Sequence, residues 1–192
     1  MSHNLTSYRL LLGSKSPRRR ELLKALDVDF RIVDISCNEA YPHALQGGDI
    51  PIYIAREKAD AYRDMLQPDE LLITADTIVW LEGAVLGKPR DEADASRMLR
   101  MLSGNTHQVY TGVCLTTKQR QKAFADCTDV SFRKLTDAEI SYYVSTYRPF
   151  DKAGAYGIQE WIGMAACTAI NGSYFNVMGL PVHRVAEELA NW

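Results

Sequence analysis

The segment 13–20 combines serines, a proline and four basic side chains at a point where a strand would give way to a helix. Ser16 fits the N-cap of that helix and Pro17 its first position. Acidic residues are usual in a first helical turn, but arginines occupy residues 18–20. Each cation opposes the positive end of the helix dipole, at a cost of about 0.3–1 kcal/mol. A bound phosphate would offset that cost, because arginine and helix N–H donors both suit its oxygens. The alternative is a solvated basic turn.

An aspartate, Asp76, follows an apolar run at residues 71–75. The run has the length and composition of a buried parallel strand, and we expect Asp76 at its carboxyl end. Ligands of α/β proteins bind at the carboxyl ends of such strands. A carboxylate there can hold Mg²⁺ or orient a water molecule, and the sequence does not separate these roles. The alternative is an aspartate that caps a turn.

Isolated charged residues in other loops are further candidates. Pro89 biases Lys88 toward an extended backbone, so this lysine could bind phosphate as a point charge. Glu39, in a loop after the second expected strand, is another candidate carboxylate. The run Arg56-Glu57-Lys58 is typical of a solvated helix face. A surface position is the alternative for each of these residues.

The segment 151–159 is a glycine-rich loop with small side chains. Its two glycines permit close approach of the backbone to a ligand. Gln159, at its end, could read the edge of a nucleic-acid base with one donor and one acceptor. By itself the segment is only a glycine-rich loop.

Strands alternating with helices would position the candidates in the first half of the chain. Residues 38–49 contain a proline and two adjacent glycines and are expected to form a loop. The apolar spacing predicts strands at 8–12, 30–35 and 71–75, and helices at 17–26 and about 51–66.

The second half is expected to be richer in hairpins. A Glu82-Gly83 turn would join strands at 78–81 and 85–86, and Thr136 with Glu139 forms a capping-box signature. Further strands are expected at 107–117, 122–133 and 165–171, and helices at 91–102, 136–147 and 181–190. The sum is a mixed α/β fold over residues 1–192, one domain of two lobes around a cleft.

Composition narrows the function classes. The chain has 192 residues, and 22 basic against 24 acidic side chains give a net charge of −2, which disfavours a mainly electrostatic nucleic-acid binder. Four cysteines and four histidines are scattered, so neither a disulfide scaffold nor a Cys- or His-ligated metal site is indicated. No apolar stretch is long enough to cross a bilayer, and the polar start of the chain lacks a signal-peptide core. We expect a cytoplasmic protein without a membrane partner.

Taken together and in this order, the motifs resemble those of the Maf family of nucleoside triphosphate pyrophosphatases. The likeness runs from about Leu10 to the C-terminus. No single motif is decisive, but the ordered set is specific. The matching pieces are SKSPRR at 14–19, AREKA at 55–59, TADT at 74–77, KP at 88–89, LSG at 102–104, HQVYTG at 107–112, DKAGAYGIQ at 151–159, GSY at 172–174 and GLP at 179–181.

The resemblance implies a fold similar to inosine triphosphate pyrophosphatases: an elongated mixed α/β sheet with two lobes around a deep cleft, in a homodimer. It also implies metal-dependent hydrolysis of a nucleoside triphosphate to the monophosphate and pyrophosphate. The 151–159 segment looks like that of the branch acting on dTTP and UTP, which makes these and modified pyrimidine triphosphates the expected substrates.

Matched residue by residue, the resemblance implies roles for eight side chains. Those with implied catalytic roles are Asp76, Lys58 and Lys88; those with implied substrate-binding roles are Ser14, Arg18, Arg19 and Gln159; and Asp76 with Glu39 would hold Mg²⁺, or Mn²⁺ or Co²⁺ in its place. At position 38, where the family commonly has an acidic residue, this chain has Asn38, which weakens the assignment of Glu39.

Three competing functions follow from the same residues. The first is a nucleotide-binding regulator of division or septum formation that binds triphosphate without turnover. A second is a nucleic-acid-binding module, which predicts a steep dependence of binding on salt. A third is a pyrophosphatase for damaged purine triphosphates, which a comparison of ITP with UTP would separate.

Overall fold

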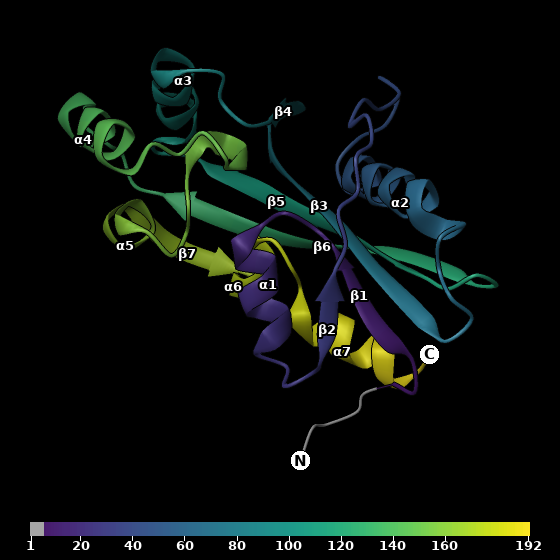
Figure 1. The fold of residues 1–192 in the computed structure, drawn as a ribbon. Helices are drawn as coiled ribbons and strands as arrows, with labels where there is room; N and C mark the ends of the chain where they lie inside the picture. The colour runs from purple at the N-terminus through teal and green to yellow at the C-terminus, as the bar shows by residue number, and fades with distance from the viewer. Residues whose placement is uncertain (1–5) are drawn as a thin grey trace. The chain divides into compact units, whose positions relative to one another are not determined.

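The computed structural model describes residues 6–192 and has a mixed α/β fold (Figure 1), which confirms the predicted fold class. The chain divides into two compact units. The first unit contains the chain up to Asp76, Thr111–Asp126 and Gly179–Trp192, and the second unit contains Thr77–Tyr110 and Cys127–Met178. A single domain with its two lobes around a cleft stays a prediction.

Within the described residues, the strands form a seven-stranded sheet of order β2-β1-β3-β5-β6-β7, with β4 paired to β3. β1 is parallel to both β2 and β3, whereas the β3–β4 and β6–β7 pairs are antiparallel. The strands are β1 Arg9–Gly13, β2 Phe30–Ile32, β3 Glu70–Leu81, β4 Ala84–Leu86, β5 Thr106–Thr116, β6 Gln121–Phe132 and β7 Cys167–Asn171. The three longest, β3, β5 and β6, each continue from one unit into the other.

Side-chain caps fix where three of the helices begin. Ser16 accepts a hydrogen bond from the Arg19 backbone N–H at the start of the first helix. Asp91 caps the helix Glu92–Leu102, and Thr136 with Glu139 forms the predicted capping box of the helix Asp137–Tyr147. The helices are α1 Pro17–Lys24, α2 Asp49–Arg63, α3 Glu92–Leu102, α4 Asp137–Tyr147, α5 Trp161–Ala166, α6 Tyr174–Met178 and α7 Val182–Ala190, with a 3₁₀ turn, η1, at Ala153–Ala155.

The prediction that Asp76 ends a strand was wrong, because β3 runs through it to Leu81. The apolar run stops at Ala75, but backbone pairing does not require an apolar side chain. The parallel pairing with β1 does stop nearby, where Gly13 lies opposite Thr74. Asp76 therefore lies just beyond the parallel part of β3.

Several short elements were missed or misplaced. The strand expected at 165–171 starts only at Cys167, because α5 occupies the residues before it. Helix α6 and turn η1 were not predicted, and the second strand stops at Ile32 rather than residue 35. The short helices span less than two helical turns, and β2 has three residues and β7 five, so these elements carry too little periodicity to be predicted from sequence.

Each unit has its own apolar core. In the first unit, Leu11, Leu72 and Cys114 of the sheet pack with Ala55 and Ala59 of α2. The core of the second unit joins side chains of β3, β6, α3, α4 and α5 with those of the 153–158 segment. Each unit therefore holds its own candidate side chains on a packed scaffold.

Candidate active site

Two carboxylates of the first unit share one lysine. The Nζ atom of Lys58 lies 2.8 Å from Oδ1 of Asp76 and 2.9 Å from Oε1 of Glu39. The side chains of Lys58 and Asp76 are only 13% and 14% exposed, whereas that of Glu39 is 51% exposed. Three residues predicted from sequence thus meet at one ammonium group, and the solvated-face interpretation of Lys58 is wrong.

The packing of α2 against β3 explains this meeting. Ala55 and Ala59 are buried on the helix face that covers the sheet, and Thr74 Oγ1 donates to the carbonyl oxygen of Ala55 at 2.6 Å. Alternate residues of a strand share a face, and residues three apart share a face of a helix. Asp76, two residues after Thr74, therefore meets Lys58, three residues after Ala55.

The turn before α1 is folded as its sequence predicts. The Ser16 backbone N–H donates to Ser14 Oγ at 3.2 Å, and Ser14 is buried. Arg18 is half-buried at the start of the helix. The turn thus presents the predicted residue types at the helix N-terminus, and phosphate binding there stays a prediction.

The Arg19 side chain contacts the backbone of two other segments of the first unit. Its Nη1 donates to the carbonyl oxygen of Ala75 at 2.9 Å, and its Nε donates to that of Gly179 at 2.8 Å. Burial lowers the pKa of Arg19, and the nearby Asp76 opposes this effect. The guanidinium therefore fixes the backbone next to Asp76.

Lys88 and Gln159 belong to the second unit, where their loops are joined. The Gly154 backbone N–H donates to the carbonyl oxygen of Gly87 at 3.0 Å, and Gly154 adopts φ +67°, which glycine tolerates. Lys88 is exposed. The Oε1 atom of Gln159 is buried and has no hydrogen-bond partner among residues 6–192. Their approach to the residues of the first unit stays a prediction.

The oxygen donors at Lys58 suit a hard divalent cation. Glu39 and Asp76 both direct an oxygen to the same cationic atom, and Mg²⁺ is commonly held by one or two carboxylates plus substrate phosphates. Among residues 6–192, no group of three or more His, Cys, Asp or Glu side chains could hold a metal ion. Of the predicted site residues, Glu39 and Asp76 have the oxygen ligands that such an ion prefers.

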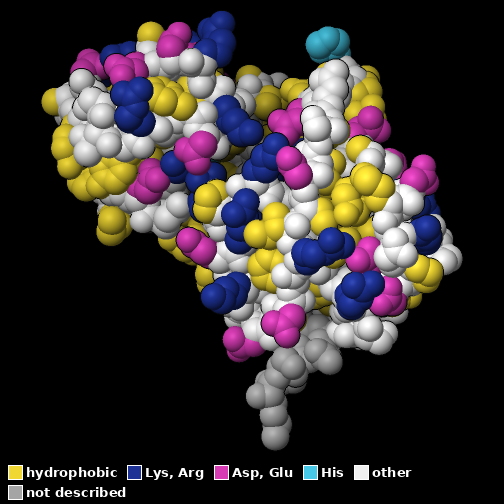
Figure 2. All heavy atoms as spheres, in the orientation of Figure 1, with side chains coloured by type: hydrophobic (Ala, Val, Ile, Leu, Met, Phe, Trp, Pro, Cys, Tyr) yellow, Lys and Arg dark blue, Asp and Glu magenta, His cyan; other side chains and the backbone are white. Residues whose placement is uncertain are grey.

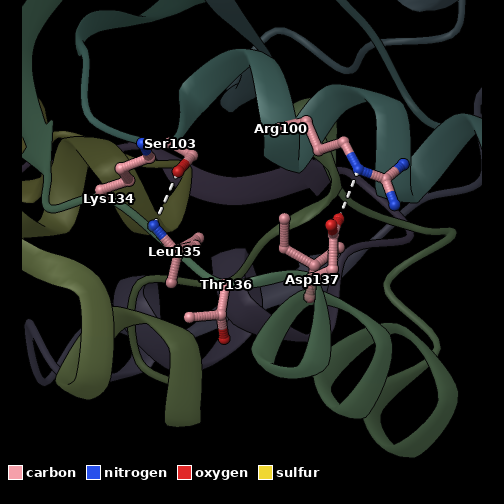
Figure 3. Close-up of a pocket in the computed structure, with 7 residues that line it drawn as sticks. Arg100, Ser103, Lys134, Leu135, Thr136 and Asp137 are labelled. Carbon is pink, nitrogen blue, oxygen red and sulfur yellow. Dashed lines mark hydrogen bonds and ion pairs between the residues drawn. The ribbon is translucent and has the colours of Figure 1, made fainter.

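A separate pocket of about 380 Å³ lies in the second unit, between the end of α3 and the start of α4 (Figure 3). Arg100 Nε donates to Oδ1 of Asp137 at 2.8 Å across it, and the Leu135 backbone N–H donates to Ser103 Oγ at 2.7 Å. None of the eight predicted site residues lines this pocket. On the face drawn in Figure 2, basic and acidic side chains are interspersed.

Two polar clusters around the 151–159 loop were not predicted. His107 Nε2 lies 2.8 Å from the Tyr156 hydroxyl, and burial lowers the pKa of His107 to about 4. Tyr143 donates its hydroxyl to Glu160, which also pairs with Lys152. His107 and Lys152 lie within motifs that the sequence singled out, but nothing in the sequence pairs them with these partners.

Comparison of the chain with known proteins identifies its family. Residues 9–192 match the family model described as Maf-like protein. A protein of Phocaeicola vulgatus called "dTTP/UTP pyrophosphatase" is 56% identical over 190 residues, covering 98% of both chains. Proteins of the same name from Bacteroides fragilis and Parabacteroides distasonis are 57% identical, with 98% of both chains covered, and 52% identical, with 100% of both covered.

The chain therefore belongs to the Maf-like protein family. The structure of the Staphylococcus aureus Ham1 protein matches with a TM-score of 0.47 and 15% identity, covering 65% of this chain and 71% of that one. No helix among residues 6–192 is both long and apolar enough to span a membrane.

Proposed function

We propose that this chain hydrolyses dTTP and UTP to the nucleoside monophosphate and pyrophosphate in the cytoplasm, and accepts modified pyrimidine triphosphates. The names of its relatives at 52–57% identity support this substrate class. The observation that carries the chemistry is the partly buried Lys58 ammonium between Glu39 and Asp76. A fixed lysine stabilises charge on a reacting phosphate, and the two carboxylates hold this ammonium in place.

The basic residues neutralise the substrate. A nucleoside triphosphate carries about four negative charges near neutral pH, and its reaction depends on positioning and on charge stabilisation. Ser14 and the N–H groups at the start of α1 bind phosphate oxygens together with Arg18 and Arg19. Lys58 and Lys88 add point charges on the reacting phosphates.

A divalent cation would complete the site. Glu39 and Asp76 would hold Mg²⁺, or Mn²⁺ or Co²⁺ in its place. When bound, such an ion supplies charge neutralisation on the phosphate oxygens.

The reaction is a displacement at the α-phosphorus. A water oxygen forms a bond to that phosphorus, and the bond to the oxygen bridging the α- and β-phosphates breaks. Pyrophosphate leaves with the bonding electron pair. The Asp76 carboxylate orients the water and accepts its proton, while Lys58 holds Oδ1 of Asp76 in place.

Gln159 recognises the base. Uracil and thymine carry an N–H donor at ring position 3, whereas cytosine has an acceptor there. The buried Oε1 atom of Gln159 is an acceptor in need of a donor. This pairing favours dTTP and UTP over CTP.

Pyrophosphate release from dTTP, UTP, CTP, ITP and 7-methyl-GTP tests the proposal, with Mg²⁺, Mn²⁺ or EDTA. We expect metal-dependent release from dTTP and UTP, and a loss of about 100-fold or more in Asp76→Asn, which should keep the circular dichroism spectrum of the wild type. Binding of UTP without release would instead indicate the regulator. Pyrophosphate release with EDTA present would show that the reaction needs no metal. A fully active Asp76→Asn would show that it does not need the aspartate.

A further inference from the structure

A partly buried polar network lies around the residue that we assign to the base. The hydroxyl of Tyr143, a fully buried side chain of α4, donates to Oε2 of Glu160. The same hydroxyl accepts a hydrogen bond from the Gly157 backbone N–H at 3.0 Å. Lys152 Nζ lies 3.1 Å from Oε1 of Glu160 and 2.7 Å from Oδ1 of Asp151. The network therefore uses both Glu160 oxygens.

These contacts fix the chain on both sides of Gln159. Tyr143 holds the backbone two residues before it and the side chain directly after it. Ile158, between them, is only 5% exposed. A Cβ atom on Gly157 would lie 2.9 Å from the Glu160 carboxyl carbon, so the loop is closely packed against that side chain. The orientation of Gln159 is consequently set by its neighbours.

Stability alone is a weak reason for an ion pair at this place. The side chains of Lys152 and Glu160 are 10% and 20% exposed, and desolvation of such a pair offsets much of its attraction. Glu160 is also the N-cap residue of α5, yet its side chain makes no capping bond there. The carboxylate instead points back to the 151–159 loop.

We propose that Glu160 is a positioning residue that, with Tyr143 and Lys152, orients the Gln159 amide and so sets the choice of base. This inference rests on the proposed function. Glu160 does not touch the substrate; it acts through the backbone that carries Gln159. A substitution of Glu160 should therefore change the preference for UTP over CTP more than it changes the rate of UTP hydrolysis.

The test is the ratio of kcat/KM for UTP to that for CTP. Glu160→Gln keeps the shape of the side chain and removes the charge that holds Lys152. We expect this ratio to fall about fivefold to tenfold, the effect of about one net hydrogen bond. Tyr143→Phe, which removes only the hydroxyl, should lower it similarly and serves as the test where Glu160→Gln does not fold.

The matched control is Glu139→Gln in the same unit. Glu139 pairs with Arg133 at 2.6 Å and completes the Thr136 capping box, so its carboxylate is held by partners outside the network of Tyr143, Lys152 and Glu160. This variant should lower thermal stability and keep the UTP to CTP ratio.

A double variant tests whether Glu160 acts through Gln159. In a Gln159→Ala background, Glu160→Gln should leave the ratio unchanged. The proposal is wrong if Glu160→Gln and Tyr143→Phe keep the wild-type ratio, or if the fall persists without Gln159. A wild-type protein that does not hydrolyse UTP, or does not favour it over CTP, would instead refute the proposed function.

Discussion

At the scale of single residues, Arg19 shows how one side chain can serve the backbone of a site. Its guanidinium donates to the carbonyl oxygens of Ala75 and Gly179. The three arginines after Pro17 predict phosphate binding, which stays a prediction for Arg19 beside these backbone contacts. The hydrogen bond from Arg19 to the carbonyl oxygen of Ala75 could not be predicted from sequence, because it depends on how β3 and α1 pack.

Arg19→Lys should destabilise the protein. A lysine lacks the planar fork needed to donate to both carbonyl oxygens, so at least one buried acceptor loses its partner, at about 1–3 kcal/mol. Urea unfolding measures the loss. The control is Arg20→Lys, because within residues 6–192 the Arg20 side chain makes one long, 3.4 Å bond to the carbonyl oxygen of Lys15. Equal losses in both variants would contradict the assigned contacts.

The buried histidine His107 gives the molecule a pH-dependent stability. Its pKa is lowered by burial from 6.5 to about 4 in the folded protein. The unfolded chain therefore binds more protons between these pH values, so stability falls as the pH is lowered from about 6.5 to 4. Full protonation of the unfolded state alone would cost on the order of 3 kcal/mol.

Unfolding free energies measured from pH 7 to pH 4 test this expectation. His107→Gln removes the titration and can still hydrogen-bond to Tyr156, so its stability should vary less over this window. Glu139, whose pKa is lowered from 4.5 to about 2 by Arg133 and Thr136, loses its contribution as the pH falls from about 4.5 toward 2, so most of its loss lies below this window. Parallel pH profiles for the wild type and His107→Gln would show that His107 titrates normally.

At the scale of elements, the contact between β5 and the start of α2 depends on Gly112. A Cβ atom there would lie 2.3 Å from the carbonyl carbon of Pro51 and 2.4 Å from the nitrogen of Ile52. Both are backbone atoms and cannot move aside singly. The close approach helps to hold α2, and thus Lys58, against the sheet.

Gly112→Ala should therefore cost about 3 kcal/mol or more, the upper end for overpacking, and should also lower activity through Lys58. Thermal unfolding followed by circular dichroism measures the first effect. Gly87→Ala is the control for stability, because a Cβ at Gly87 would meet nothing within 4 Å. A Gly112→Ala protein as stable as the wild type would mean that α2 can move away at little cost.

The sequence predicted most long elements but not how they meet. Apolar periodicity and caps located α1, α3, α4 and the β3–β4 hairpin within a few residues, because these signals are local. Contacts such as Lys58 with Glu39 join residues far apart in the chain, so only the resemblance to a family put them in one site. The Tyr143–Glu160 contact had no sequence signal at all, since it depends on the packing of α4 against a loop.

At the scale of the whole molecule, the homodimer implied by the family resemblance remains to be tested. Sedimentation equilibrium at micromolar concentration should give twice the chain mass of 21.6 kDa. Helices α5 and α6 carry exposed apolar side chains, Met164 and Phe175 among them. These side chains should become less accessible to solvent if they lie in the dimer interface. A mass of 21.6 kDa at all concentrations would show that the chain is a monomer.

The way the chain passes between the two units constrains its synthesis. The last segment of the first unit is Gly179–Trp192. The carbonyl oxygen of Gly179 accepts the hydrogen bond from Arg19 Nε. A nascent chain therefore cannot complete the surroundings of Asp76 until helix α7 has left the ribosome. A protein truncated after Met178 should be cleaved rapidly by a protease where the full chain resists. Premature termination would then yield no active hydrolase, so only a fully translated message could contribute to the cell's nucleotide turnover.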